Sequence, residues 1–145
     1  MIKKIIETID PKLLEQFFPS ELLSYFFISG FKTLCNIEIK EEFLEIEFEE
    51  KNELPKGYSS LLYESKGFTE SKLIQDFPLR GKAVYLRIKT RRWRHKQTKA
   101  IIKRDFSFIA DGSKFTKELS DFLKEASGYA TRYYEQHSEL LRGEE

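Results

Sequence analysis

Two stretches of this chain alternate apolar with polar residues, and the two stretches carry opposite charge. The first covers residues 35–49 and the second covers residues 84–94. Alternation with a period of two places successive side chains on opposite faces of a strand, so each stretch predicts a half-buried β-structure. We therefore expect a β-sheet at the centre of the fold.

The acidic stretch predicts a β-hairpin with one buried face and one charged face. Between residues 38 and 53 the chain has eight acidic residues against two lysines. The charged face is either a solvated strand surface or the partner of the basic segment in the folded protein. The apolar positions expected to be buried are Cys35, Ile37, Ile39, Leu44, Ile46 and Phe48.

The second stretch lies within a strongly basic segment. Residues 80–104 contain eleven arginines and lysines and no acidic residue. We interpret residues 84–109 as a second, basic hairpin, with a turn at His95–Lys99 and a return strand at Ala100–Ile109. Its buried face is expected to include Val84, Leu86 and Ile88, with either Ile101 and Ile109 or Phe106 and Phe108 on the return strand. A further strand is expected at Ser71–Phe77, turning through Arg80-Gly81, whereas residues 61–68 show no clear pattern.

Helices are expected at both ends of the chain. Asp10-Pro11 has the form of a helix start, with Asp10 as the N-cap and Pro11 at the first helical position. Ser20 is expected to cap a second helix that ends at Gly30. At the other end, Ser113 is expected to cap a helix from Lys114 to Ala126, and residues 129–141 form another helical candidate.

The expected fold class is therefore α+β. It consists of N-terminal helices, two antiparallel β-hairpins forming a small sheet, and C-terminal helices. We expect residues 1–112 to form a nucleic-acid-binding domain with the basic hairpin 84–109, and residues 113–145 to form a helical extension. A chain of 145 residues is long enough to bury its own core.

Cysteine usage and hydropathy favour a cytoplasmic protein. Cys35 is the single cysteine, so neither an internal disulfide nor a zinc site built from cysteines can form within the chain. We interpret Cys35 as a small buried hydrophobe. We expect no secretory signal, because Glu7 and Asp10 interrupt the N-terminus before an apolar run develops. The longest apolar stretch, residues 22–31, is far short of the ~20 residues that a membrane span needs.

The sequence carries no recognisable catalytic motif. It has no P-loop, no GxGxxG, no GxSxG and no HExxH pattern. The glutamates fall on what we interpret as solvated strand faces, and nothing marks the aspartates as a converging set. We therefore expect a non-catalytic protein with no cofactor and no metal.

The basic segment is the strongest candidate for a binding site. A two-stranded ribbon can enter the major groove of DNA, and lysines and arginines on it would displace counterions from phosphates. The opposing interpretation is an ordinary charged strand that faces the acidic hairpin. Simple alternation would place residues 85, 87, 89, 91 and 93 on one face. The candidate nucleic-acid-binding residues are Arg80, Lys82, Arg87, Lys89, Arg91, Arg92, Trp93, Arg94, Lys96, Lys99, Lys103 and Arg104.

Three segments together carry a resemblance to a known family. They are Ser60–Leu79, Arg80–Arg94 with its Arg-Arg-Trp-Arg motif, and Arg104–Lys124. They resemble the N-terminal region protein of a family of bacterial insertion-sequence transposases, in which the catalytic part is encoded downstream. The resemblance covers residues 54–124.

The resemblance implies a DNA-binding, non-catalytic module that recognises the ends of a mobile element during DNA transposition. Larger transposases of similar order often hold a β-ribbon with zinc through paired cysteines. In those transposases a cysteine would follow the position of Arg94, but this chain has His95-Lys96-Gln97 there. We therefore expect a zinc-ribbon-like hairpin without zinc. The family's catalytic aspartate and glutamate set finds no match here.

By the same resemblance, five arginines and lysines are expected to position the protein on DNA, and Trp93 either supports the hairpin or contacts a base. Those five are Arg87, Lys89, Arg91, Arg92 and Arg94. Two alternatives stay open. One is a protein-interaction module that forms a homodimer or docks on the catalytic transposase subunit. The other is an RNA or single-strand binder, with Tyr85 and Trp93 stacking on bases.

Overall fold

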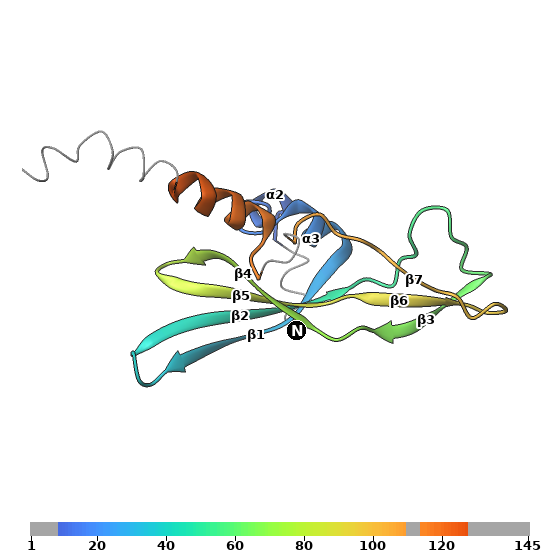
Figure 1. The fold of residues 1–145 in the computed structure, drawn as a ribbon, viewed down its shortest axis with the longest axis horizontal. Helices are drawn as coiled ribbons and strands as arrows, with labels where there is room; N and C mark the ends of the chain where they lie inside the picture. Colours follow the sequence, from blue (N-terminus) through green and yellow to red (C-terminus); the bar gives the residue numbers. More distant parts are fainter. Residues whose placement is uncertain (1–8, 110–113, 128–145) are drawn as a thin grey trace, which may run out of the picture.

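The computed structural model describes residues 9–109 and 114–127 and has an α+β fold with two small sheets (Figure 1). A mixed sheet of four strands has the order β1-β2-β5-β4, and an antiparallel sheet of three strands has the order β3-β6-β7. The elements are α2 (Pro11–Leu14), α3 (Ser20–Tyr25), β1 (Phe26–Asn36), β2 (Glu41–Glu50), β3 (Tyr63–Phe68), β4 (Lys72–Leu79), β5 (Lys82–Lys89), β6 (Arg91–His95) and β7 (Ile101–Lys103). A further helix covers residues 117–127.

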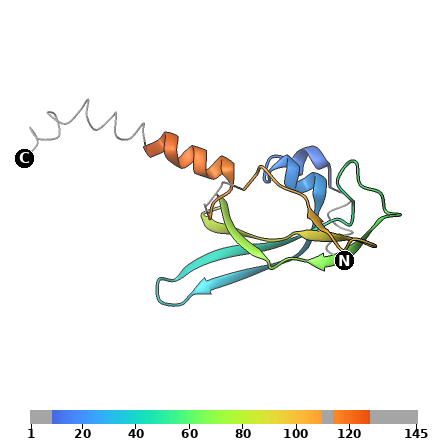
Figure 2. The ribbon, with the colours of Figure 1, turned by 45° about the vertical axis from the view of Figure 1, so that its right-hand side comes forward.

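The expected acidic hairpin is confirmed, although its strands begin and end elsewhere. β1 and β2 pair antiparallel around a turn at residues 37–40. Ile37 and Ile39 lie in this turn and are exposed, and Cys35 is also exposed, so the expectation that these three are buried was wrong. The hairpin extends beyond the rest of the sheet, so no described element covers its far end (Figures 1 and 2).

The second N-terminal helix is shorter than expected. It ends at Tyr25, and the chain turns directly into β1, in which Phe26 and Ile28 are buried. Gly30 lies not at a helix end but next to a register irregularity within β1. The apolar cluster of residues 22–28 fits a helical period and a strand period equally well, and pairing with β2 decides between them. The start of the first helix is as expected, because the Asp10 side chain accepts a hydrogen bond from the backbone N–H of Lys12.

The basic hairpin is also much shorter than the expected 84–109. β5 does not pair with a return strand. It pairs parallel with β2 on one side and antiparallel with β4 on the other. Arg80 and Gly81, at φ 51° and 77°, form the tight turn that joins β4 to β5. Among the described strands of the expected segment, only β6 and β7 form a basic hairpin.

One hydrophobic core lies on a single face of the four-stranded sheet. Val84, Leu86 and Ile88 of β5 are buried, as the alternation predicts, and Leu22 of α3 packs into the same cluster. Phe106 and Phe108 also pack there, against Phe26, although they lie outside any strand. α2 and α3 therefore cover the core face, and among the described elements no helix or strand covers the other face of the sheet (Figure 1).

The two edges of the four-stranded sheet differ. At the β4 edge, the backbone of Gln75 exchanges hydrogen bonds with Lys114 and Thr116, which closes the edge. Helix 117–127 starts directly after this contact, three residues later than the expected Lys114, with Leu119 buried, and then leads away from the sheet (Figure 2). At the other edge, β1 pairs with β2 alone among the described strands. The expected cap Ser113 and the expected helix 129–141 lie outside the described residues.

Candidate nucleic-acid interface

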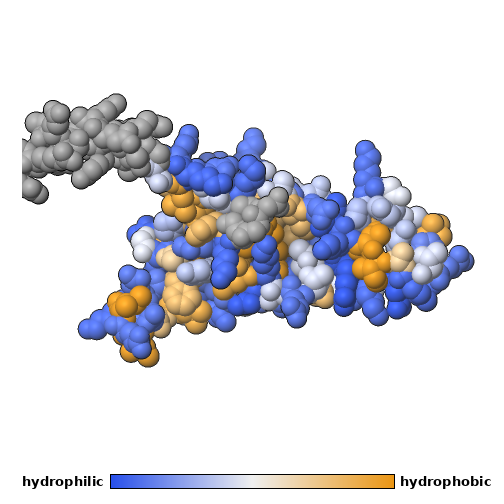
Figure 3. All heavy atoms as spheres, in the orientation of Figure 1, coloured by the Kyte–Doolittle hydropathy of each residue, from blue (hydrophilic) through white to orange (hydrophobic). Residues whose placement is uncertain are grey.

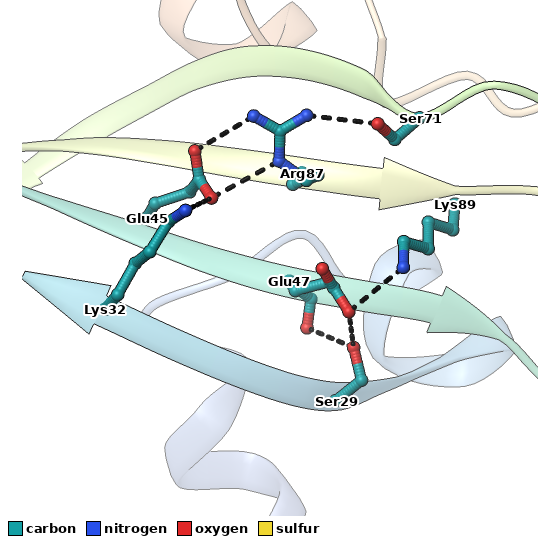
Figure 4. Close-up of polar contacts among 7 residues, drawn as sticks. All are labelled: Ser29, Lys32, Glu45, Glu47, Ser71, Arg87 and Lys89. Carbon is teal, nitrogen blue, oxygen red and sulfur yellow. Dashed lines mark hydrogen bonds and ion pairs between the residues drawn. The ribbon is translucent and has the colours of Figure 1, made fainter.

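The uncovered face of the four-stranded sheet carries a charge ladder, formed by Lys32, Glu45, Glu47, Arg87 and Lys89 (Figure 4). The Arg87 guanidinium donates to both carboxylate oxygens of Glu45, from Nε at 3.2 Å and from Nη2 at 3.1 Å. Lys89 Nζ lies 3.3 Å from the Glu47 carboxylate. The parallel register of β2 and β5 places Glu47 opposite Arg87 and Glu49 opposite Lys89, and each cation pairs diagonally with the glutamate two residues earlier on β2.

The ladder neutralises the basic residues of β5. The hydrogen bonds from Arg87 lower the pKa of the nearly buried Glu45 carboxyl, and the same contact raises the pKa of Arg87. Lys32 adds a second cation 3.3 Å from Glu45. Of the two interpretations that the sequence left open for the acidic face, the structure supports the partner of the basic segment. Arg87 and Lys89 are thus held within the protein, which reduces their value as phosphate contacts.

A buried carboxylate joins the two sheets. Glu50, at the end of β2, accepts a hydrogen bond of 2.8 Å from the backbone N–H of Arg91, at the start of β6. Arg91 Nε donates to the Glu50 carbonyl at 2.8 Å, and Arg104 Nε forms an ion pair with the carboxylate at 3.4 Å. Burial raises the pKa of the Glu50 carboxyl, opposed by the Arg91 N–H. Arg91 and Arg104 are therefore structural at this junction.

The three-stranded sheet has one covered face, and Trp93 lies on it. Trp93 is 1 % exposed, and its indole Nε1–H donates to the Asn52 side chain at 2.9 Å. Residues of the loop that follows β2, including Leu54 and Tyr58, line a pocket together with Trp93. Of the two roles expected for Trp93, this position fits support of the hairpin, because stacking on a base would require it to leave the core.

The opposite face of this sheet is basic. Residues paired directly across antiparallel strands share a face, and the register aligns Arg92 with Lys103 and Arg94 with both Ile101 and Glu64. Since side chains alternate along a strand, Arg92, Arg94 and Lys103 lie on the face opposite Trp93. Arg94 forms an ion pair of 2.7 Å with Glu64, which lowers the pKa of that exposed carboxyl. Among the described residues, no ion pair involves Arg92 or Lys103.

The turn of the β6–β7 hairpin adds two exposed cations, Lys96 and Lys99. His95 Nδ1 accepts hydrogen bonds from the backbone N–H groups of Gln97 and Thr98, both at 3.1 Å, which holds the turn in one conformation. Lys96 N–H donates to the carbonyl of Leu62 at 2.8 Å and so ties the turn to the segment before β3. We call Arg92, Arg94, Lys96, Lys99 and Lys103 together the basic face.

The twelve residues selected from the sequence thus fall into separate groups. Arg80 and Lys82 lie at the β4–β5 turn, at the opposite end of the molecule from the β6–β7 turn (Figure 1). Arg87 and Lys89 belong to the charge ladder, whereas Arg91, Trp93 and Arg104 are structural. The remaining five form the basic face. The expected single face of residues 85–93 does not form. Ile88 before Thr90 and Trp93 after it are both buried, although strict alternation would place an even-numbered and an odd-numbered residue on opposite faces, so the alternation breaks at Thr90.

The pattern of residues 61–68 did not predict β3 (Tyr63–Phe68) or the end of the turn before it. Tyr63 of β3 pairs with His95, and Glu64 pairs with Arg94. The segment contains a β-propensity signal in Tyr63 and Phe68, but two consecutive leucines and Gly67 interrupt the alternation. Tertiary pairing with β6 makes it a strand.

No protein-family model matches the chain, and no curated protein or solved structure shows a significant similarity to it. Within residues 9–109 and 114–127, no group of three or more histidine, cysteine or acidic side chains is placed to hold a metal ion. In the same part of the chain, no helix has both the length and the apolar character required to cross a membrane.

Proposed function

We propose that this protein is the DNA-binding, non-catalytic module of a split insertion-sequence transposase and that it contacts duplex DNA through the basic face. The observation that carries the proposal is the register of β6 and β7, which places Arg92 opposite Lys103 and next to Arg94 on the face away from Trp93. The resemblance of residues 54–124 to the N-terminal region of such transposases supports the assignment to transposition and to a role at the element ends, and the single cysteine supports a cytoplasmic location.

The proposal narrows the interface from twelve residues to five. Phosphate contacts need cations that are not already committed to carboxylates, because each committed cation would have to break an ion pair before it could bind. Among the described residues, four members of the basic face meet this requirement, because only Arg94 forms an ion pair, with Glu64. In the proposal, the β6–β7 hairpin takes the place of the zinc-bound ribbon, and Trp93 with Asn52 supplies the rigidity that a metal would supply.

A titration of the full chain against duplex DNA at several salt concentrations tests this interface. The variant carries Lys96→Glu, Lys99→Glu and Lys103→Glu, all at exposed positions that form no ion pair with a carboxylate among the described residues. We expect much weaker binding and a salt dependence whose slope falls by about three, one unit per phosphate contact. Fluorescence anisotropy of a labelled duplex measures both.

The matched control carries Lys12→Glu, Lys56→Glu and Lys124→Glu, which are exposed positions outside the basic face with the same change of net charge. We expect it to bind almost as tightly as the wild type. Equal weakening of both variants would show a general effect of net charge and refute the assignment to the basic face. Absence of wild-type binding at low salt would refute DNA binding altogether.

A second candidate, a homodimer, is favoured by the open β1 edge. Phe31 on this strand is 62 % exposed. Antiparallel pairing of two copies centred on Thr33 would set Phe31 opposite Cys35 and Lys32 opposite Leu34, so no like charges would face each other. Light scattering coupled to size-exclusion chromatography tests it, with Phe31→Glu expected to convert a dimer to a monomer. A wild type that is monomeric over a wide concentration range rejects it.

A further inference from the structure

Two apolar projections extend from this molecule, one from each of its two sheets. One is the β1–β2 turn, where Ile37 is 86 % exposed, and Figure 3 shows apolar atoms at the end of this hairpin. The other is the segment before β3, where Leu61 is 81 % exposed and Leu62 about half exposed, at 49 %. Single exposed leucines are common, but a pair on an ordered projection beside charged groups is a candidate contact.

The two projections differ in the charge that surrounds them. The β1–β2 turn is flanked by Glu38, Glu41 and Glu42, with Lys40 between them. The projection of Leu61 and Leu62 lies beside the basic turn, because Lys96 N–H donates to the Leu62 carbonyl. Lys99 lies in the same turn. A polyanion is therefore repelled from the first projection and attracted to the second.

The Leu61–Leu62 projection is ordered. The backbone N–H groups of Leu62 and Tyr63 both donate to the Ser59 carbonyl at 3.0 Å, and Leu61 N–H donates to the Ser59 hydroxyl at 3.1 Å. Behind them, the Tyr63 ring packs edge-on against Tyr58 on one side and His95 on the other. Because the backbone is held in this way, little backbone entropy is lost when the side chains that it carries are inserted into a ligand.

From this arrangement we propose that Leu61, supported by Leu62, is an apolar wedge that enters the minor groove of duplex DNA and partly unstacks a base step. Proteins that bend DNA combine such apolar wedges with lysine and arginine contacts to the flanking phosphates. Lys96 and Lys99 supply those contacts here. The proposal rests on DNA binding through the basic face and adds that the bound duplex is kinked at the wedge.

The test uses duplexes of about 25 base pairs that carry 2-aminopurine at a central TA step, because pyrimidine–purine steps unstack most easily. A donor and an acceptor dye at the two ends report bending. Wild-type protein is expected to increase the 2-aminopurine fluorescence and to bring the ends closer together. Leu61→Gln is expected to remove both signals while keeping salt-dependent binding, with affinity within about tenfold of the wild type.

Ile37→Gln is the matched control, since it removes an equally exposed apolar side chain from the acidic projection. It is expected to leave both signals unchanged. Thermal unfolding of both variants checks that the fold is retained. If the wild type binds with the expected salt dependence but gives neither signal, or if Leu61→Gln keeps both, the wedge is refuted and DNA binding stands. If the wild type does not bind at all, the wedge is refuted together with the DNA-binding proposal.

Discussion

β5 and β6 are consecutive strands that each carry three arginines or lysines, yet the structure uses their charges differently. Lys82, Arg87 and Lys89 of β5 all pair with glutamates of β2. On β6, by contrast, the neighbouring strands β3 and β7 place one carboxylate, Glu64, opposite Arg94. Whether a cation on a strand is free to bind a ligand therefore depends on the register of the neighbouring strand as much as on the sequence of the strand that carries the cation.

The physical reason is the fixed spacing of strands in a sheet. Adjacent strands lie about 4.8 Å apart, so an arginine and a glutamate on neighbouring strands and on the same face meet without distortion. A shift of one residue in the β2–β5 register would move the glutamates to the core face and the apolar residues to the charged face. Burial of Ile46 and Phe48 therefore also determines which cations are neutralised.

The largest effect is expected at Glu50, where the two sheets meet. Glu50→Ala would leave the buried Arg91 N–H without its acceptor and Arg104 without its ion pair, which costs about 3 kcal/mol of the free energy of unfolding. Urea unfolding followed by circular dichroism measures it, and Trp93 fluorescence in parallel reports on the three-stranded sheet alone. We expect both signals to shift together.

Glu50→Gln is the control for this prediction, since the amide oxygen can still accept from the Arg91 N–H. Its loss of stability is expected to be smaller. If Glu50→Ala unfolded at the same urea concentration as the wild type, the junction would be shown not to join the two sheets. Separate transitions for the two signals would show that each sheet is stable independently.

The same substitution on the two strands tests the comparison directly. Arg87→Met leaves the nearly buried Glu45 with Lys32 alone, and we expect a loss of about 1–2 kcal/mol after allowance for the partial exposure of Arg87. Its DNA affinity should stay near the wild-type value. Arg92→Met should leave stability within about 0.5 kcal/mol, weaken DNA binding and lower the salt slope by about one.

The contribution of Arg87 should also depend on pH. The pKa of Glu45 is lowered in the folded state, so the stabilisation is present above the ordinary glutamate pKa and is lost as the pH falls through the lowered value. The difference in unfolding free energy between the wild type and Arg87→Met should therefore shrink in acid. If Arg87→Met reduced DNA affinity as much as Arg92→Met, the division between the two strands would be refuted.

A smaller effect is expected at the closed β4 edge. Asp76 is buried, and its carboxylate accepts a hydrogen bond of 2.9 Å from the Thr116 hydroxyl. Burial raises the pKa of Asp76, so its protonated form is favoured in the fold and stability falls as the pH rises through the raised value. Asp76→Asn does not titrate and keeps the hydrogen bond.

The stability of Asp76→Asn relative to the wild type should therefore increase as the pH rises from about 4. Unfolding curves across this range measure the difference. Thr116→Val, which removes the donor, serves as the companion variant. A difference that is constant with pH would show that Asp76 does not titrate differently in the folded and unfolded states.

The smallest effect is expected at Lys82, which pairs with Glu42 at 3.2 Å on the surface. Because both side chains are well exposed, solvent screens the pair, and Lys82→Met should change the free energy of unfolding by at most about 0.5 kcal/mol. DNA affinity should be unchanged, because Lys82 lies outside the basic face. A clear loss of DNA binding would extend the interface along β5 and contradict the separation proposed above.

Local patterns predicted several elements correctly. Alternation identified β1–β2 as a hairpin and Val84, Leu86 and Ile88 as buried, and the Asp10-Pro11 pair marked the start of α2. They did not identify the parallel partner of β5, because alternation with one apolar face is typical of antiparallel strands, and β5 pairs parallel with β2. β3 was missed for a related reason, since its pairing with β6 rather than its own pattern makes it a strand.

The sequence by itself determined where the charges lie along the chain, which faces of the strands are apolar and that the chain combines helices with sheets. Only the tertiary structure decided which charges neutralise one another, that Trp93 is buried and that Leu61 projects beside Lys96. Local periodicity follows from the backbone geometry of one strand and can be detected in the sequence. Pairing between distant strands follows from the burial of the whole core, so it emerges only when the chain is folded.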